Sequence, residues 1–256
     1  VLSYDSMFES LWKQTQLNEE LKCNEKMQKE FINIAAHELR TPVQPILGMA
    51  ELLELSFEGG KEKIEISKDD IELILRNAKR LERLSSDVLE TARIESQSLR
   101  LNKERFGLKE VISGSIRDAE SQIDDQDITI RYDPKDIVVN ADKGRISEVI
   151  SNILDNAIKF TRKGRIAIYT EVKTNNNHNT YDDEAIVLIR DEGAGIDSEI
   201  ASRLFSKFAT NSQKGTGLGL YISKSIVEAH GGKIWAKNNE DEKGATFGFS
   251  LPLNQD

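Results

Sequence analysis

The apolar pattern of this chain changes around Phe106-Gly107, and the change limits the chain to two different kinds of folding module. Before this point the sequence reads as helix almost throughout. After it, five short strand-like segments occur among three segments with helical spacing. A length of 256 residues also exceeds one typical domain. We therefore expect an all-α module followed by an α+β module.

The segment from about Phe8 to Leu101 predicts a helical hairpin, interrupted at Pro42, at Pro45 and between Ser56 and Gly60. The second arm carries residues at alternating steps of three and four that form the seam of a packed bundle: Ile71, Ile74, Ala78, Leu81, Ser85, Val88 and Ala92. The first arm offers a matching set: Phe31, Ile34, Leu39, Val43, Ile46, Ala50 and Leu53. Two helices cannot enclose both seams, so we predict a homodimer that forms a four-helix bundle.

We divide the chain into three segments. Residues 1–24 predict a helical lead-in, for which a coiled coil is one interpretation; residues 25–102 form the dimerisation hairpin, and residues 103–256 form the α+β module. The expected strands of that module are Ile128–Tyr132, Arg165–Val172, Ala185–Arg190, Lys233–Lys237 and Ala245–Leu251. The expected helices lie near residues 108–123, 143–161 and 217–229.

Composition excludes several classes of protein. The formal charge is -9, with acids and bases interspersed and no Lys/Arg block, which argues against a nucleic-acid partner. The single cysteine, Cys23, allows no internal disulfide and no multi-cysteine zinc site. No run approaches the roughly 18 apolar residues of a membrane span, so we expect a cytoplasmic segment. Because it begins at Val1, we also expect a fragment that lacks an upstream sensor module, and membrane anchoring of the parent stays open.

The first chemical candidate lies in residues 31–48, FINIAAHELRTPVQPILG. On a helix His37 and Thr41 are one turn apart, so the hydroxyl would lie beside the imidazole. Neutral imidazole is a nucleophile, and a carboxylate that holds one ring N–H, such as Glu38, raises the reactivity of the other nitrogen. Pro42 is expected to bend or loosen the helix there. Taken alone, a surface histidine on an amphipathic helix is the commoner explanation of this segment.

The second candidate is a polar stripe on the helix expected at residues 143–161. Glu148, Asn152 and Asn156 recur at intervals of four, and Lys159 and Phe160 extend the stripe. Amide oxygens suit magnesium, an ammonium group suits phosphate and an aromatic ring suits a base. An ordinary amphipathic helix would also show a polar stripe, so the stripe needs support from other segments.

That support comes from two glycine-rich segments. Asp191-Glu-Gly-Ala-Gly-Ile196 follows an apolar strand, and its glycines permit close backbone approach to a ligand. Lys214-Gly-Thr-Gly-Leu-Gly-Leu220 leads into a helix, whose N-terminus and backbone N–H groups suit phosphates. A P-loop is excluded because no GxxxxGK[ST] occurs, and a Rossmann site is excluded because the glycines are not in a βαβ unit. Each segment alone would be read as a tight turn.

Five segments occur in order, HELRTP, NILDNAIKFT, DEGAGI, LFSKFA and KGTGLGL, and together they resemble the H, N, G1, F and G2 boxes of the sensor histidine kinases. The resemblance is to a HisKA-type dimerisation and phosphoacceptor domain followed by a GHKL/Bergerat-type HATPase_c domain, which is related to gyrase, the Hsp90 chaperone and MutL. It implies a dimeric four-helix bundle, then an α/β sandwich whose mixed sheet has helices on one face. It also implies a protein-histidine kinase with ATP and Mg²⁺ as cofactors.

The implied activity is autophosphorylation of His37 and transfer of the phosphoryl group to an aspartate of a response regulator receiver domain, with phosphatase activity towards the regulator left open. By resemblance, Glu38 acts as general base and Thr41 orients water in the phosphatase reaction. Pro45 departs from the family pattern, in which a non-proline residue is more common.

The nucleotide roles are implied by the same resemblance. Asn156 is the first choice as magnesium ligand and Asn152 the second; Lys159 lies near phosphate, Phe160 beside adenine, and Asp191 at the adenine amino group. Phe205 and Phe208 anchor a mobile lid, and Thr246 supports the adenine floor. The remaining implied nucleotide-binding residues are Gly193, Gly195, Ile196, Lys214, Gly215, Thr216, Gly217, Leu218 and Gly219.

Three functions remain in competition: an active kinase, an ATP-driven conformational clamp, and a dimeric scaffold with an inert nucleotide site. HELRTP favours the kinase over the clamp, because a clamp has no need of a phosphoacceptor histidine. The scaffold is disfavoured because no matched box has lost its asparagine, acid or glycines.

Overall fold

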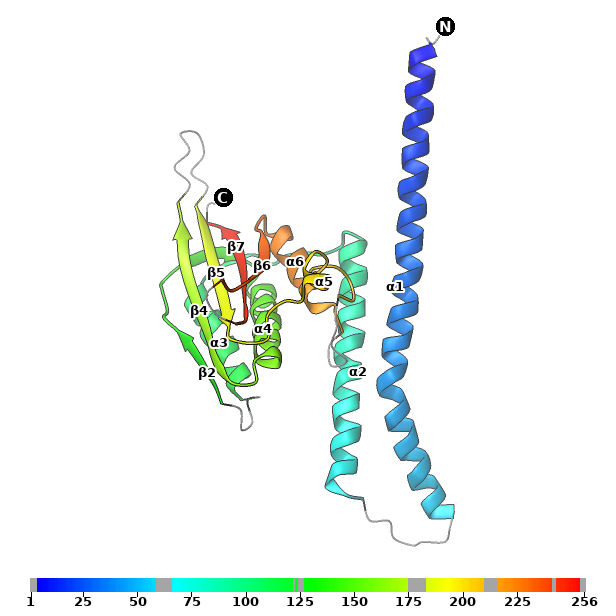
Figure 1. Cartoon of the computed structure of the whole chain (residues 1–256), viewed down its shortest axis with the longest axis vertical. Coiled ribbons are helices and arrows are strands. Elements are labelled where there is room, and N and C mark those ends of the chain that lie inside the picture. The colour runs from blue at the N-terminus through cyan, green and yellow to red at the C-terminus, as the bar shows by residue number, and fades with distance from the viewer. Residues whose placement is uncertain are drawn as a thin grey trace. The chain divides into compact units, whose positions relative to one another are not determined.

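A computed structural model describes residues 4–58, 66–121, 123, 127–174, 183–209, 216–240 and 243–253 (Figure 1). The chain divides into two compact units, residues 1–88 and 89–256. The first is helical and the second combines helices with β-sheet. The predicted order of an all-α part followed by an α+β part is confirmed.

The first unit contains the helix α1, Tyr4–Glu58, and most of the helix α2, Lys68–Glu95. Ser67 and Asp70 begin α2 with reciprocal hydrogen bonds: the Asp70 N–H donates to the Ser67 hydroxyl at 3.1 Å, and the Ser67 N–H donates to the Asp70 carboxylate at 3.1 Å. This arrangement satisfies amide groups that a helix N-terminus leaves without partners. The predicted hairpin arms are therefore both present.

The two prolines do not interrupt the first arm. α1 is continuous across Pro42 and Pro45, so the predicted breaks at these positions are wrong. Each proline lacks one N–H donor, and the helix of 55 residues continues past both of them. At the other predicted break the helix runs on to Glu58, and residues 59–65 lie outside the described part of the chain.

A single hairpin covers only part of its apolar surface. Phe31, Ala35 and Leu84 are buried, with Leu84 fully inaccessible. Of the predicted seam in α2, Ile74, Leu81 and Val88 are half-buried, whereas Ile71 is exposed. Other large apolar side chains on these helices also remain exposed: Ile32, Leu47, Leu52, Leu55 and Leu75. The hairpin thus retains apolar surface that a partner would bury.

The second unit is built on a five-stranded mixed sheet in the order β2-β4-β5-β7-β6. Its strands are β2, Ile128–Tyr132; β4, Gly164–Lys173; β5, Glu184–Asp191; β6, Ile234–Asn238; and β7, Ala245–Pro252. The β2–β4 pair is parallel and the other pairs are antiparallel. The helices α3, Leu108–Glu120, α4, Lys143–Phe160, and α6, Gly219–Ala229, cover one face (Figure 1).

The predicted strands and helices of this unit are all present, with ends that differ by a few residues. Three short elements were not predicted. β1, Glu104–Gly107, pairs antiparallel with β3, Val138–Ala141, and α5 covers only Ser198–Ala201. Four residues are too few to establish a strand or helix period in a sequence.

The helix α4 lies against the inner face of the sheet because one side of it is entirely apolar. Its buried residues are Ile146, Val149, Ile150, Ile153, Leu154 and Ala157. They share the core with inward-facing strand residues: Ile166, Ile168, Ile189, Phe247 and Phe249. Asp142 caps the start of α4 by accepting a hydrogen bond from the Arg145 N–H at 3.1 Å. Burial of the stripe fixes the rotation of α4, and with it the direction of its polar residues.

Gly232 provides a test of the packing between α6 and β7. A methyl group on Gly232 would lie 1.9 Å from the carbonyl oxygen of Ser250, so Gly232→Ala is expected to lower the free energy of unfolding by about 3 kcal/mol. Gly114→Ala is the matched control, because its methyl group would have only the end of Arg117 at 4.0 Å. In the middle of α3 this control is expected to be neutral or to stabilise by up to about 1 kcal/mol. Urea unfolding that shows equal effects for the two variants would contradict this packing.

Candidate functional site

His37 lies on α1 with its ring open to solvent. Its side chain is 76% exposed, and its Nδ1 lies 3.6 Å from Oε1 of Glu38. This distance is longer than a direct hydrogen bond, but the carboxylate is next to the nitrogen that it would have to hold. The ring is therefore accessible to a reaction partner and has an acid at one of its nitrogens.

Glu38 is oriented by an arginine that the sequence analysis missed. Arg80 Nη2 donates to Glu38 Oε2 at 3.1 Å, and both side chains are about three-quarters buried, with exposed fractions of 29% and 26%. Because one oxygen of Glu38 is occupied by Arg80, the other is left facing His37. The two residues are 42 positions apart, so no local pattern could have identified the pair.

Thr41 is exposed, and its hydroxyl donates to the backbone carbonyl of His37 at 3.0 Å. The hydroxyl was expected beside the imidazole of His37; in this rotamer it donates instead to the backbone of that residue, one helical turn away. A threonine oxygen that donates one hydrogen bond can still accept others, for example from water.

Asn152 and Asn156 are half-buried and one turn apart on α4. The Asn152 amide Nδ2 lies 3.4 Å from the Gly219 carbonyl oxygen and 3.4 Å from the Ser223 hydroxyl. These contacts join α4 to the first turn of α6. Glu148, the third member of the predicted polar stripe, instead forms an ion pair with Arg145 at 3.0 Å.

Asp191 ends β5 as a buried carboxylate, with only 3% of its surface exposed. Its Oδ1 accepts hydrogen bonds from the Gly193 N–H at 2.9 Å and the Ala245 N–H at 3.2 Å. Burial raises the pKa of Asp191 above its ordinary value, although the two amide hydrogen bonds act in the opposite direction. Ionisation of a buried carboxyl group is energetically unfavourable, and side chains with pKa values shifted in this way are common in functional sites.

The turn after Asp191 packs against the end of α4. A methyl group on Gly193 would lie 2.6 Å from the Phe160 carbonyl oxygen, which also accepts a hydrogen bond from the Ala194 N–H at 3.2 Å. The Phe160 ring itself is 44% exposed, and Lys159 Nζ lies 5.0 Å from its centroid. The structure therefore brings Lys159, Phe160 and Asp191 into one region.

The second half of this turn is held by Asn238, another residue that sequence reasoning missed. The Ile196 N–H donates to Asn238 Oδ1 at 2.6 Å, and Asn238 Nδ2 donates to the Ile196 carbonyl at 2.9 Å. Gly195 has a φ of +80°, in the left-handed region that favours glycine. The close fit of this turn thus requires both the glycines and a side chain from β6.

The second glycine segment is described from Thr216 onward; Lys214 and Gly215 lie outside the described residues. The Thr216 hydroxyl accepts a hydrogen bond from the Leu218 N–H at 3.2 Å, and Leu218 is buried. A methyl group on Gly217 would lie 2.7 Å from the backbone of Phe208. Phe208 therefore packs beside this segment, and Gly219 then begins α6 next to Asn152.

Thr246 does not join this group, which corrects the prediction that it supports the floor of the pocket. It pairs across the sheet with Arg190, whereas Asp191 has the opposite parity and faces the helices. Its hydroxyl donates to Asn239 Oδ1 at 2.7 Å. Ala245, one residue earlier, makes the contact with Asp191. Because successive strand residues point to opposite faces, a displacement of one position moves the side chain to the other side.

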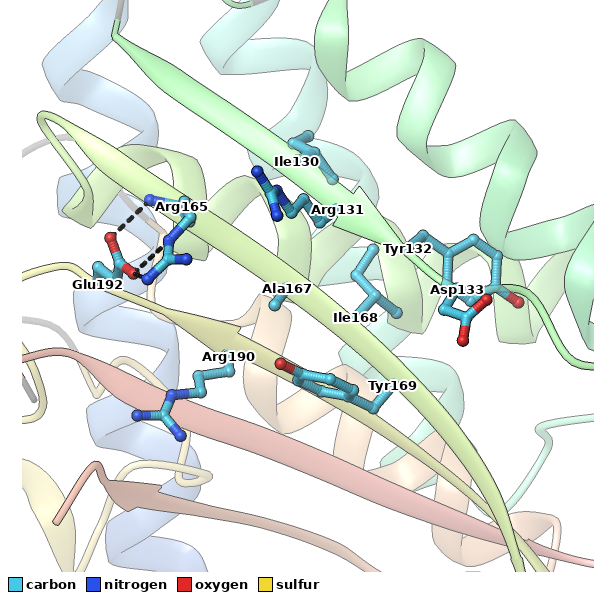
Figure 2. A pocket seen from close by; sticks show the side chains of 10 residues that line it. All are labelled: Ile130, Arg131, Tyr132, Asp133, Arg165, Ala167, Ile168, Tyr169, Arg190 and Glu192. Atoms are coloured by element: carbon cyan, nitrogen blue, oxygen red, sulfur yellow. Dashed lines mark hydrogen bonds and ion pairs between the residues drawn. The ribbon is translucent and has the colours of Figure 1, made fainter. Parts of the chain in front are cut away.

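The helix-free face of the sheet carries a separate hollow of about 730 Å³ (Figure 2). Arg131, Arg190 and Tyr169 surround Ala167 there, and Arg165 is paired with Glu192 at 2.7 Å. None of the predicted nucleotide residues lines it. The candidate nucleotide site is therefore not this hollow but the helix-side region between α4, the Asp191 turn and α6.

Two features are absent from the described ranges: a metal-binding cluster of side chains and a membrane-spanning helix. No group of three or more His, Cys, Asp and Glu side chains in these ranges is placed to hold a metal ion. In the same part of the chain, no helix is both long and apolar enough to cross a membrane.

Two family descriptions match the chain. Residues 27–97 match the His Kinase A (phospho-acceptor) domain, and residues 141–255 match the histidine kinase-, DNA gyrase B-, and HSP90-like ATPase family. Sensor protein SrrB of Staphylococcus aureus is 33% identical over 236 residues, which cover 89% of this chain and 38% of that protein. The chain thus spans well under half the length of these curated relatives.

Solved structures of similar fold include the Acinetobacter baumannii histidine kinase AdeS, with 27% identity, a TM-score of 0.69, and coverage of 86% of this chain and 98% of that chain. The catalytic domain of histidine kinase ThkA is 35% identical with a TM-score of 0.51, and covers 59% of this chain and 96% of that chain. ThkA in complex with the response regulator protein TrrA is 27% identical with a TM-score of 0.64, and covers 96% of this chain and 66% of that chain.

Burial of the Asp191 carboxylate generates a test that needs no ligand. Since its pKa is raised in the folded protein, ionisation of Asp191 destabilises the fold as pH rises from about 3.9, the ordinary value, through the raised value. Asp191→Asn keeps an oxygen for the two amide donors and removes the charge. The variant is expected to unfold at a higher urea concentration than wild type at pH 7, with a difference that shrinks towards pH 4. An Asn variant that is less stable at pH 7 would refute this account of the carboxylate.

Proposed function

This chain belongs to the sensor histidine kinases, and on that premise we propose that it phosphorylates its own His37 from ATP and passes the phosphoryl group to an aspartate of a response regulator. The observation that carries the proposal is the exposed imidazole of His37, with the Glu38 carboxylate beside its Nδ1, in the same chain as a matched ATPase domain.

The residues around His37 suit nucleophilic attack by a ring nitrogen. Glu38 Oε1 lies 3.6 Å from Nδ1, so we assign the proton of the neutral ring to Nδ1, which leaves the lone pair on Nε2. A bond forms between Nε2 and the γ-phosphorus while the bond from that phosphorus to the bridging oxygen breaks, which releases ADP. As positive charge develops on the ring, Glu38 accepts the Nδ1 proton as general base, and Arg80 holds Glu38 in place.

The second unit supplies residues for an adenine nucleotide. The Asp191 carboxylate would accept a hydrogen bond from the adenine amino group, and the exposed ring of Phe160 would lie beside the base. The close approach of Gly193 and Gly195 to their neighbours leaves room only for glycine at this turn. Lys159 would lie near the phosphates. Phe205 and Phe208 would anchor a lid that ends at Gly215 to Gly219, and Lys214, Gly215, Thr216, Gly217, Leu218 and Gly219 would contact the nucleotide.

The polar face of α4 also fits a magnesium ion. Asn156 and Asn152 present amide groups one turn apart, and both are half-buried rather than sealed in the core. Magnesium in nucleotide sites typically has few protein ligands and is held largely by phosphates and water. When bound, the ion would neutralise charge on the phosphates. Asn156 remains the first choice as ligand.

The exposed apolar surface of the helices indicates a second copy of the chain as one partner, and the family indicates a response regulator as another. The exposed apolar residues of α1 and α2 would be buried in a homodimeric four-helix bundle. The structure of ThkA was determined with the response regulator TrrA, and we extend that kind of partner to this chain. Thr41 would orient water if the chain also dephosphorylates its regulator. We place the chain in the cytoplasm, where ATP is available.

Incubation with γ-labelled ATP and Mg²⁺ tests the proposed reaction. The label is expected on the protein, stable in alkali and lost in acid, as for a phosphoramidate. His37→Gln should remove it, whereas Thr41→Ala, which leaves the nucleophile intact, should retain it. An ATP-driven clamp or an inert scaffold would give no such label, and equal labelling of His37→Gln and wild type would exclude His37 as acceptor.

The asparagine assignment has its own test. Asn156→Ala should weaken binding of an ATP analogue in the presence of Mg²⁺ by about tenfold or more, because an oxygen ligand is lost from a charged site. Binding without Mg²⁺ should change much less. Asn77→Ala, which removes an amide from α2, is the control and should bind as wild type does. A Mg²⁺-independent loss in the Asn156 variant would argue against a ligand role. Equilibrium titration with a fluorescent ATP analogue gives both affinities.

A further inference from the structure

His230 occupies the C-cap of α6, as its position before two glycines predicts. The Gly231 N–H donates to the Glu228 carbonyl at 2.9 Å, and the Gly232 N–H donates to the Val227 carbonyl at 3.0 Å. Gly231 has a φ of +80°. These features form a Schellman turn, which ends the helix sharply and fixes the direction of the cap residue. The His230 side chain is consequently held in the interior, with 2% of its surface exposed.

Both ring nitrogens of His230 have backbone partners. Nδ1 lies 2.8 Å from the Ile226 carbonyl oxygen, and Nε2 lies 2.9 Å from the backbone nitrogen of Asp142. A carbonyl can only accept and an N–H can only donate, so Nδ1 must carry the proton and Nε2 must present its lone pair. The geometry therefore selects one neutral tautomer of His230.

Asp142 connects this histidine to two other elements. Its Oδ1 accepts the Arg145 N–H at 3.1 Å and so caps α4, while its Oδ2 accepts the Asn102 N–H at 2.8 Å just before β1. The backbone N–H of Asp142 donates the hydrogen bond that His230 Nε2 accepts. One aspartate thus joins the start of α4, the segment before β1, and the end of α6.

The same two helices carry much of the candidate nucleotide site. Asn152, in the middle of α4, contacts Gly219 and Ser223 near the start of α6, and His230 connects the start of α4 to the end of α6. Two separated ties define the relative position of two helices far better than one. We propose that His230 is a positioning residue for the nucleotide site, which holds the start of α4 to the end of α6 only while its imidazole is neutral. This inference rests on the proposed nucleotide-binding function.

Acid should break the hydrogen bond between the Asp142 N–H and His230 Nε2, because a protonated imidazole has N–H groups on both nitrogens and cannot accept a hydrogen bond. The charged groups that act on the ring are Lys103, which disfavours protonation, and Asp142, which favours it. Burial is the largest influence and lowers the pKa of His230, while the Ile226 carbonyl and Asp142 oppose that shift. Neutral His230 therefore makes its full contribution to the free energy of unfolding above the ordinary pKa, near 6.5. This contribution is lost as pH falls from there through the lowered pKa of the folded state.

Two substitutions each keep a different one of the two hydrogen bonds of the His230 ring. In His230→Gln the side-chain oxygen can take the place of Nε2 and accept from Asp142, without titrating. In His230→Asn the shorter amide can take the place of Nδ1 and donate to Ile226, but it leaves the Asp142 N–H without an acceptor. The amide hydrogen exchange of Asp142 is the direct readout, measured on the whole chain without nucleotide, together with urea unfolding between pH 5 and 8.

In wild type, exchange at Asp142 should be slow at pH 7.5, and, after correction for intrinsic rates, its protection should fall as pH drops below about 6.5. At pH 7.5, His230→Asn should exchange about tenfold faster at Asp142 than His230→Gln, the factor for one net hydrogen bond. His230→Gln should lose the pH dependence of protection that wild type shows. Affinity for a fluorescent ATP analogue should fall by severalfold in the Asn variant and be largely restored in the Gln variant.

Several results would overturn the positioning role. Equal exchange at Asp142 in the two variants would show that the Nε2 bond is not the tie, and an unchanged pH dependence in His230→Gln would assign that dependence to another group. The titration of wild type needs no substitution, so the inference stays testable if a variant fails to fold. Equal nucleotide affinity in wild type and both variants would also contradict the proposal. Failure of wild type itself to bind nucleotide would instead refute the proposed function, while the exchange data would still decide whether His230 holds Asp142.

Discussion

The rotational setting of α4 is the constraint on which the second unit depends. Its apolar side is buried so completely that Ile146, Val149 and Ile150 have no accessible surface. A helix held in this way cannot rotate without exposing several large side chains, each worth about 2 kcal/mol or more. Asn152, Asn156 and the backbone of Phe160 are therefore presented to the Asp191 turn and to α6 in one arrangement. The glycines of that turn are needed because the neighbouring backbone comes so close.

Stability and recognition are in conflict at Asp191. The site would be more stable with a neutral group, since burial disfavours the ionised carboxylate and only two backbone amides offset that effect. A charged acceptor is useful there if a ligand supplies a further N–H donor, as an adenine amino group would. The first unit shows the opposite arrangement at Glu38, where Arg80 balances the charge and one oxygen is left for His37. Each acid is held so that one more hydrogen-bond partner can be accommodated.

The sequence was informative where a period or an ordered set of motifs was long enough. The alternation of apolar residues predicted β4, β5 and β7, and the polar stripe of α4 predicted the direction of Asn152 and Asn156. Pairings between distant residues were not predictable, because nothing local distinguishes Arg80 as the partner of Glu38 or Asn238 as the partner of Ile196. Thr246 was misplaced because the parity of a strand residue is set by its register with the neighbouring strand. The interruption expected at Pro42 and Pro45 is absent, because a proline lowers local helix propensity without obliging the helix to end.

Selectivity between purine nucleotides tests the central claim most directly. If the Asp191 carboxylate accepts the adenine amino group, a guanine would place its carbonyl oxygen against the same carboxylate, and two acceptors would face each other. Calorimetric titration of the chain with ATP and with GTP, each with Mg²⁺, should give saturable binding of ATP and at least about hundredfold weaker binding of GTP, since a buried polar group would be left unpaired. Equal affinities for the two nucleotides, or no binding of ATP, would contradict the account.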